Sequence, residues 1–189
     1  MSDTSEKSPK YRLDGANSEA ILSWWKSLDD NRGVRARLRR AEAPSDVMLS
    51  QEFFNFLKRM PESWSKDYHL PASAMVAALL SHVKEHSSGH AFAAQLGSGD
   101  PAVMSELRFK QMIKSRTPDE LYIRLLRAIH MLKGKVNILS LVEGILLWHK
   151  EYAFGEDQNP MKRLSVQWAQ DYYLPKESKL TKQPETSME

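Results

Sequence analysis

The sequence predicts an all-α protein, a helical bundle of two small helical subdomains. Segments with caps and helical apolar spacing follow one another from about residue 18 to 174. Strand signals are weak, because the chain shows no sustained period-two alternation and no Asn-Gly hairpin. The 189 residues are 41% hydrophobic, which is enough for a core of real size.

A polar stretch over 87–99 suggests the break between the two subdomains. We therefore expect one subdomain over 17–96 and a second over 97–174. The ends, 1–16 and 175–189, are polar and lack apolar periodicity, and they are predicted to be disordered.

The first half is expected to contain four helical segments. In chain order they are a helix capped by Ser18, an arginine helix over 33–41, a segment capped by Ser50, and an alanine-rich helix from Pro71 to about His86. Apolar residues surround most of the circumference of the alanine-rich helix, so it is expected to be the buried centre of the bundle.

The second half is expected to contain four more helices, whose starts are Asp100-Pro101, Thr117-Pro118, Asn137 and Asn159-Pro160. The Thr117–Glu120 segment is a capping box with proline at the first helical position, and Gly134 ends that helix. The last helix is expected to end before Pro175.

Positive charge is segregated along the chain. The arginine cluster, residues 32–40, contains five arginines and no acid, and the second cluster, residues 108–135, has eight cations against two acids. The whole chain is +3, so the remainder must sum to −8. A segregated cationic surface attracts polyanions, of which nucleic acid is the commonest in a cell.

Helix geometry directs several of these cations away from the apolar faces. The candidate nucleic-acid-binding residues are Arg35, Arg37, Arg39, Arg40, Arg108, Lys110, Lys114, Arg116, Arg124 and Arg127. Arginine binds phosphate through paired hydrogen bonds, and such contacts carry little sequence information. Two alternatives stay open: solvated helix faces with local pairs such as Glu120 to Arg124, and a helical scaffold whose basic faces bind acidic protein partners.

No catalytic residue, metal or cofactor is expected. The chain has no cysteine, no phosphate loop and no nucleophile elbow. His82-Val83-Lys84-Glu85-His86 matches the inverted zinc-protease pattern H-x-x-E-H, in which His82 and His86 would bind zinc and Glu85 would act as base. That site lacks a third ligand, since His90 lies beyond Ser-Ser-Gly, and the alternative is two histidines at the edge of a buried face.

The composition favours a soluble, cytoplasmic protein. The first ten residues lack the apolar core of a signal peptide, and the longest apolar run, Ala72–Leu80, is too short to span a bilayer. The absence of cysteine agrees with a cytosolic location.

Four blocks of the sequence resemble the CasB family, the small subunit of the type I-E CRISPR surveillance complex Cascade. The blocks are ILSWWKSL at 21–28 with RARLRR at 35–40 and APSD at 43–46, FAAQL at 92–96, ELRFKQMIKSRTPDELYIRLLRAIHML at 106–132, and NILSLVEGILLWHKEY at 137–152. Their order and spacing carry the resemblance, which spans about 18 to 174. The chain departs from the family near Gly155–Asn159 and in the polar tail after Leu174.

The resemblance implies an all-helical protein without enzymatic activity. Family members occur as two copies, head to tail, in contact with the backbone subunits, the large PAM-recognising subunit and nucleic acid. Their basic surface steadies the hybrid of CRISPR RNA and target DNA and the displaced DNA strand. By carry-over, Arg39, Arg40, Arg108 and Arg127 match the family's basic positions, whereas the other six candidates rest on helix geometry alone.

Overall fold

The computed structural model describes residues 12–175. Ten α-helices, two 3-10 helices and two strands of two residues each make up this part of the chain, which confirms the all-α prediction. In order they are α1 (Gly15–Ser27), α2 (Arg32–Arg39), α3 (Pro44–Met48), α4 (Gln51–Leu57), η1 (Glu62–Ser65), α5 (Leu70–Leu80), β1 (Glu85–His86), α6 (Phe92–Gly97), α7 (Glu106–Ile113), α8 (Pro118–Met131), β2 (Lys135–Val136), α9 (Ile138–Phe154), η2 (Pro160–Lys162) and α10 (Leu164–Tyr173). The predicted disorder at residues 1–11 and 176–189 lies outside the described residues.

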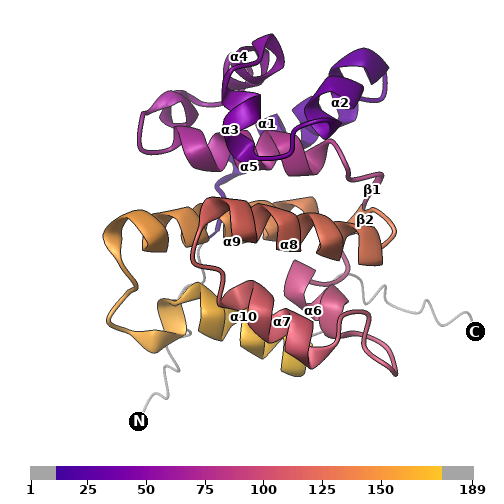
Figure 1. Cartoon of the computed structure of the whole chain (residues 1–189), viewed down its shortest axis with the longest axis vertical. Helices are drawn as coiled ribbons and strands as arrows, with labels where there is room; N and C mark the ends of the chain where they lie inside the picture. Colours follow the sequence, from indigo (N-terminus) through magenta and orange to yellow (C-terminus); the bar gives the residue numbers. More distant parts are fainter. Residues whose placement is uncertain (1–11, 176–189) are drawn as a thin grey trace, which may run out of the picture.

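The helices form three layers (Figure 1). Helices α1 to α5 lie in the upper layer, α8 and α9 in the middle, and α6, α7 and α10 in the lower layer. One hydrophobic cluster includes buried residues of all three layers, among them Leu79, Leu125 and Tyr172. Helix α6 packs against α10 so closely that a Cβ on Gly97 would lie 2.1 Å from the carbonyl oxygen of Tyr172. The division into two subdomains stays a prediction.

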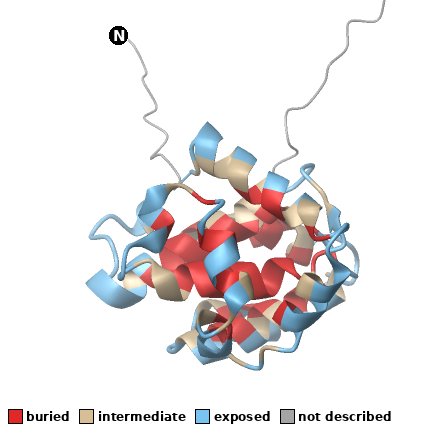
Figure 2. Ribbon diagram, turned by 90° about the horizontal axis from the view of Figure 1, so that it is seen from above, coloured by how far each residue is buried: buried red, intermediate tan, exposed pale blue. Residues whose placement is uncertain are grey.

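Helix α5 is the buried centre of the bundle, as its composition predicts. Every residue from Ala72 to Leu80 is buried, and buried residues gather at the middle of the molecule (Figure 2). The expected extension to His86 is wrong, because the chain turns at Ser81 and His82. Residues Glu85–His86 then pair in parallel with Lys135–Val136, so hydrogen bonding to β2 replaces the last turn of the predicted helix.

Side-chain caps explain where several helices begin. The side chains of Ser50, Thr117 and Asn137 accept hydrogen bonds from backbone N–H groups three residues later, which confirms three predicted caps. The first helix begins at Gly15 rather than after Ser18, because the carboxylate of Asp14 accepts a hydrogen bond from the backbone N–H of Asn17 at 2.8 Å.

Two predicted helix starts are wrong. After Asp100-Pro101 the chain folds back on α6, where the N–H of Met104 donates to the carbonyl of Leu96 at 2.9 Å, and α7 begins only at Glu106. Asn159-Pro160 opens the 3-10 helix η2, and α10 follows from Leu164. Within the described residues no helix has both the length and the apolar character needed to cross a bilayer.

Candidate nucleic-acid interface

Half of the predicted site residues carry exposed, unengaged charge. Within residues 12–175, the structure shows no hydrogen bond or ion pair for the side chains of Arg40, Arg108, Lys114, Arg116 and Arg127, and all five residues are exposed. Their exposure agrees with the helix geometry, and their role in binding nucleic acid stays a prediction.

Four other predicted residues are engaged inside the protein. Arg35 pairs with Asp29 at 3.0 Å, and its side chain is only 14% exposed. Arg37 pairs with Glu52, Lys110 with Glu106 and Arg124 with Glu120. The sequence indicates the Glu120–Arg124 pair. The other three residues are paired by acids from α4, from the turn after α1 and from the first turn of α7. The hydrogen bond and charge of Glu106 also raise the pKa of Lys110.

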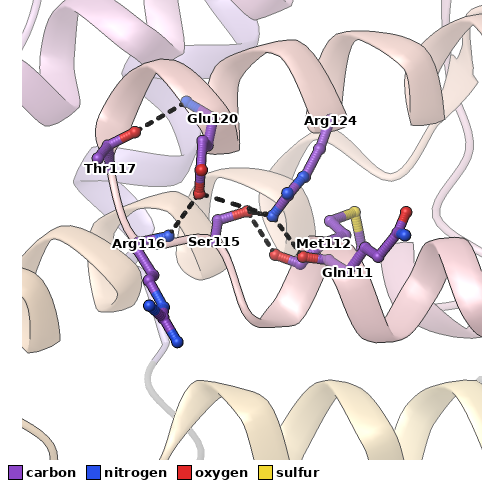
Figure 3. A network of polar contacts seen from close by, with 7 residues as sticks. All are labelled: Gln111, Met112, Ser115, Arg116, Thr117, Glu120 and Arg124. Carbon is purple, nitrogen blue, oxygen red and sulfur yellow. Dashed lines mark hydrogen bonds and ion pairs between the residues drawn. The ribbon is translucent and has the colours of Figure 1, made fainter.

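Arg124 on α8 contacts the end of α7 and links the two helices (Figure 3). Its guanidinium donates to the backbone carbonyl of Gln111 and, at 3.0 Å, to the hydroxyl of Ser115, and it lies 3.8 Å from the carboxylate of Glu120. Glu120 in turn accepts a hydrogen bond from the backbone N–H of Arg116. The predicted capping box is therefore modified, since the glutamate reaches the N–H one residue before the cap.

The fold brings the end of the arginine cluster against α8. The hydroxyl of Tyr122 on α8 donates to the carbonyl of Ala41 at 3.0 Å, just beyond α2. Arg39 and Lys133 line one pocket, although 94 positions separate them in the sequence. Residues of α7 lie in the lower layer, with α8 and α9 between them and α2 (Figure 1). The second cluster is thus divided between two places.

Sequence reasoning missed four members of this pocket. Besides Arg39 and Gly134, the lining residues are His82, Lys84, His130 and Lys133. Lys84 and Lys133 flank the short β1–β2 pairing, and this pairing has no periodicity that a sequence could reveal. The one available signal is Lys133-Gly134-Lys135 directly after a helix, where glycine favours a tight turn that exposes the lysines.

The zinc alternative finds no support in the described residues. No group of three His, Asp or Glu side chains there could bind a metal ion. His82 and His86 lie on a turn and a strand rather than on one helix, and the Nδ1 atom of His86 accepts a hydrogen bond from the backbone N–H of Ile138 at 3.2 Å. Glu85 is 3.1 Å from the ammonium group of Lys135.

A family model described as CRISPR-associated protein Cse2 matches residues 34–173, which is more than half of the chain. The match confirms the family resemblance that the four sequence blocks indicate. No curated protein and no solved structure matches the chain in the corresponding comparisons.

Proposed function

The chain belongs to the Cse2 family of CRISPR-associated proteins, whose members are subunits of the Cascade complex, and from this membership we propose a nucleic-acid-binding role. In this proposal the protein is a non-catalytic subunit. It binds nucleic acid without sequence preference and stabilises both the hybrid of CRISPR RNA and target DNA and the displaced strand.

The observation that carries the proposal is the set of unpaired cations on and next to α2 and α8. Arg40 is exposed and unengaged at the end of α2, and Arg127 is exposed and unengaged on α8. Lys84 and Lys133 contribute two more charges from the adjoining turns. Backbone phosphates are the natural counterions for such a surface, because they repeat along every strand irrespective of sequence.

Phosphate contacts of this kind suit the opening of a DNA duplex. Exchanging a DNA duplex for an RNA–DNA hybrid is nearly balanced in free energy, so protein contacts to the strands can decide the outcome. A cationic surface that binds the displaced strand opposes reannealing. Because each guide RNA differs, contacts that ignore the bases are the useful ones.

Other Cascade subunits and a second copy of the chain are the proposed protein partners. Several large apolar side chains are exposed and are candidates for these contacts; they are Leu49, Leu107, Phe154 and Leu174. The engaged cations Arg37 and Lys110 fit the rim of such interfaces, where charge sets orientation more than affinity.

Salt-dependent binding tests the proposal. The purified protein should bind single-stranded DNA of unrelated sequences with equal affinity. Replacing Arg39 and Arg40 by alanine should flatten the log–log salt slope on single strands by about 1.4, because each lost phosphate contact removes about 0.7. The measurement is fluorescence anisotropy of labelled DNA between low and moderate salt.

A double variant outside both clusters, Lys58→Ala/Lys162→Ala, has the same charge loss at two exposed positions and serves as the control. This control should leave the salt slope nearly unchanged if the phosphate contacts are confined to the two clusters. If the Arg39→Ala/Arg40→Ala and Arg108→Ala/Arg127→Ala variants bind as tightly as the parent at low salt, the basic faces serve protein partners and the scaffold alternative is correct.

A further inference from the structure

The basic pocket lies where the end of α2, the turn after α5 and the end of α8 meet. It has a volume of about 230 Å³ and is lined by Arg39, His82, Lys84, His130, Lys133 and Gly134. Three lining residues are cations, two are histidines and none is an acid. In the described part of the chain, no ion pair is found for the three cations. A concave site with this lining favours an anion.

Arg39 is held in place at the pocket. Its Nε atom donates to the carbonyl of Ser81 at 2.7 Å, which fixes the guanidinium beside the turn that contains His82. No bond is found for its terminal amino groups among the described residues. Partial burial, and then the charge of Arg35, lower the pKa of Arg39. The charge of an anion in the pocket would counteract both effects, because it stabilises the charged guanidinium.

The opposite wall is a tight turn at the end of α8. Lys133 and Gly134 both have positive φ, at 56° and 80°, and the carbonyl of Gly134 accepts the N–H groups of Lys84 and Glu85 at 2.9 and 3.1 Å. A Cβ on Gly134 would lie 2.9 Å from Cγ of Lys84. The glycine therefore permits the turn and lets Lys84 pass close to it, so both lysines stay at the rim.

His82 supplies an unused polar atom. Its Nε2 is buried and has no hydrogen-bond partner, and its ring meets that of His130 at 5.6 Å between centroids. Burial, followed by the charges of His130 and Arg39, lowers the pKa of His82 to about 4. Every charged or titratable group that lines the pocket beside His82 is basic, so nothing there offsets a positive charge on the ring.

We propose that this pocket binds one phosphate group of a nucleic-acid strand and that His82 gains a proton when the phosphate binds. The source of the phosphate rests on the function proposed above, whereas the anion preference rests on the pocket alone. The pocket has no acidic side chain beside its two histidines and three cations, and the phosphate supplies the missing negative charge.

Binding should therefore strengthen as the pH falls. The phosphate stabilises the charged form of His82, so its pKa is higher in the complex than in the free protein. Between the two pKa values the complex binds one more proton than the free protein, and the affinity rises toward the acid side. A rise of about two units would give about fourfold tighter binding at about pH 5.5 than at about pH 8.

The test is the affinity of the full chain for a labelled single-stranded oligothymidylate at these two pH values and at constant ionic strength. The parent should show the fourfold change, and His82→Gln should lose most of it. His90→Gln is the matched control, because His90 is exposed and lies outside the pocket. Should His82→Gln fail to fold, Lys84→Ala/Lys133→Ala, at two exposed positions, replaces it and should lose most of the pH dependence, because the phosphate is then no longer held beside His82.

A second measurement uses inorganic phosphate and the histidine ring signals in NMR. Phosphate should raise the pKa of His82 in the parent and not in Lys84→Ala/Lys133→Ala. If phosphate does so but the oligonucleotide does not bind, the pocket stands and the proposed function fails. If the oligonucleotide binds with the same pH dependence in His82→Gln as in His90→Gln, the pocket proposal is overturned and the proposed function stands.

Discussion

Two arginines one turn apart on α8 show how differently the same side chain is used in two regions of this molecule. Arg124 faces the end of α7, where a backbone carbonyl, a hydroxyl and a carboxylate surround its guanidinium. Arg127 is exposed and, within residues 12–175, has no partner. The comparison teaches that the neighbours of a cation, and not the count of cations, decide whether its charge stabilises the fold or attracts a ligand.

The largest expected effect concerns a buried histidine and the stability of the protein at low pH. His149 is buried, its Nε2 has no partner, and desolvation with the charge of His69 lowers its pKa to about 4. A lowered pKa favours the neutral form in the folded state, so stability is complete above about pH 6.5 and falls as the pH drops toward 4. The loss should reach about 3 kcal/mol.

Chemical denaturation at a series of pH values measures this loss. His149→Leu should flatten the profile between about pH 6.5 and 4, since leucine has nothing to protonate. The exposed His90→Gln variant should keep the parent profile. An unchanged acid profile in His149→Leu would show that His149 does not cause the loss of stability at low pH.

Arg124→Ala should destabilise the protein and leave nucleic-acid binding almost intact. The change leaves the Gln111 carbonyl and Glu120 without their guanidinium, at a cost of about 1 to 2 kcal/mol for hydrogen bonds to a partly exposed charge. The thermal midpoint should fall by several degrees, while the salt slope of DNA binding should stay within about 0.3 of the parent. A slope that falls by a full contact would place Arg124 in the interface.

Arg127→Ala should give the reverse result. Exposed and unpaired charge contributes little to stability, so the thermal midpoint should not change measurably. The salt slope should flatten by about 0.7 to 0.9, the value of one phosphate contact. Loss of stability without a change in slope would break the comparison between the two arginines.

Removal of an acidic partner should have the smallest effect on DNA binding, and it should tighten binding instead of weakening it. Glu52→Gln removes the carboxylate that pairs with Arg37, so the freed guanidinium should tighten DNA binding by about twofold. Glu42→Gln, at an exposed position for which no side-chain partner is found in the described residues, makes the same charge change as a control. Equal tightening in both variants would mean that net charge alone controls binding.

Local signals made much of this fold predictable. The caps at Ser50, Thr117 and Asn137 act within three residues, and the apolar circumference of α5 reports its burial directly. The end of α5 is misplaced because it depends on a distant contact, the pairing of Glu85–His86 with β2. Such pairing is a tertiary effect with no local code.

The candidate site was predictable only in part, for the same reason. Exposure of Arg40 and Arg127 follows from their place on amphipathic helices. The engagement of Arg37 by Glu52 does not, because the acid approaches from a different helix. The pocket joins Arg39 with two residues after α5 and with three at the end of α8, and only the folded chain brings these three segments together.

The position of α5 has a consequence for the slow motions of the molecule. Its residues from Ala72 to Leu80 are enclosed by the neighbouring helices, and many of them are alanines that let those helices approach closely. Partial opening at the surface cannot expose such amides, so their hydrogen exchange with solvent should proceed only through global unfolding. The slowest-exchanging amides should thus lie in the alanine-rich α5, and their rates should report the stability of the whole protein.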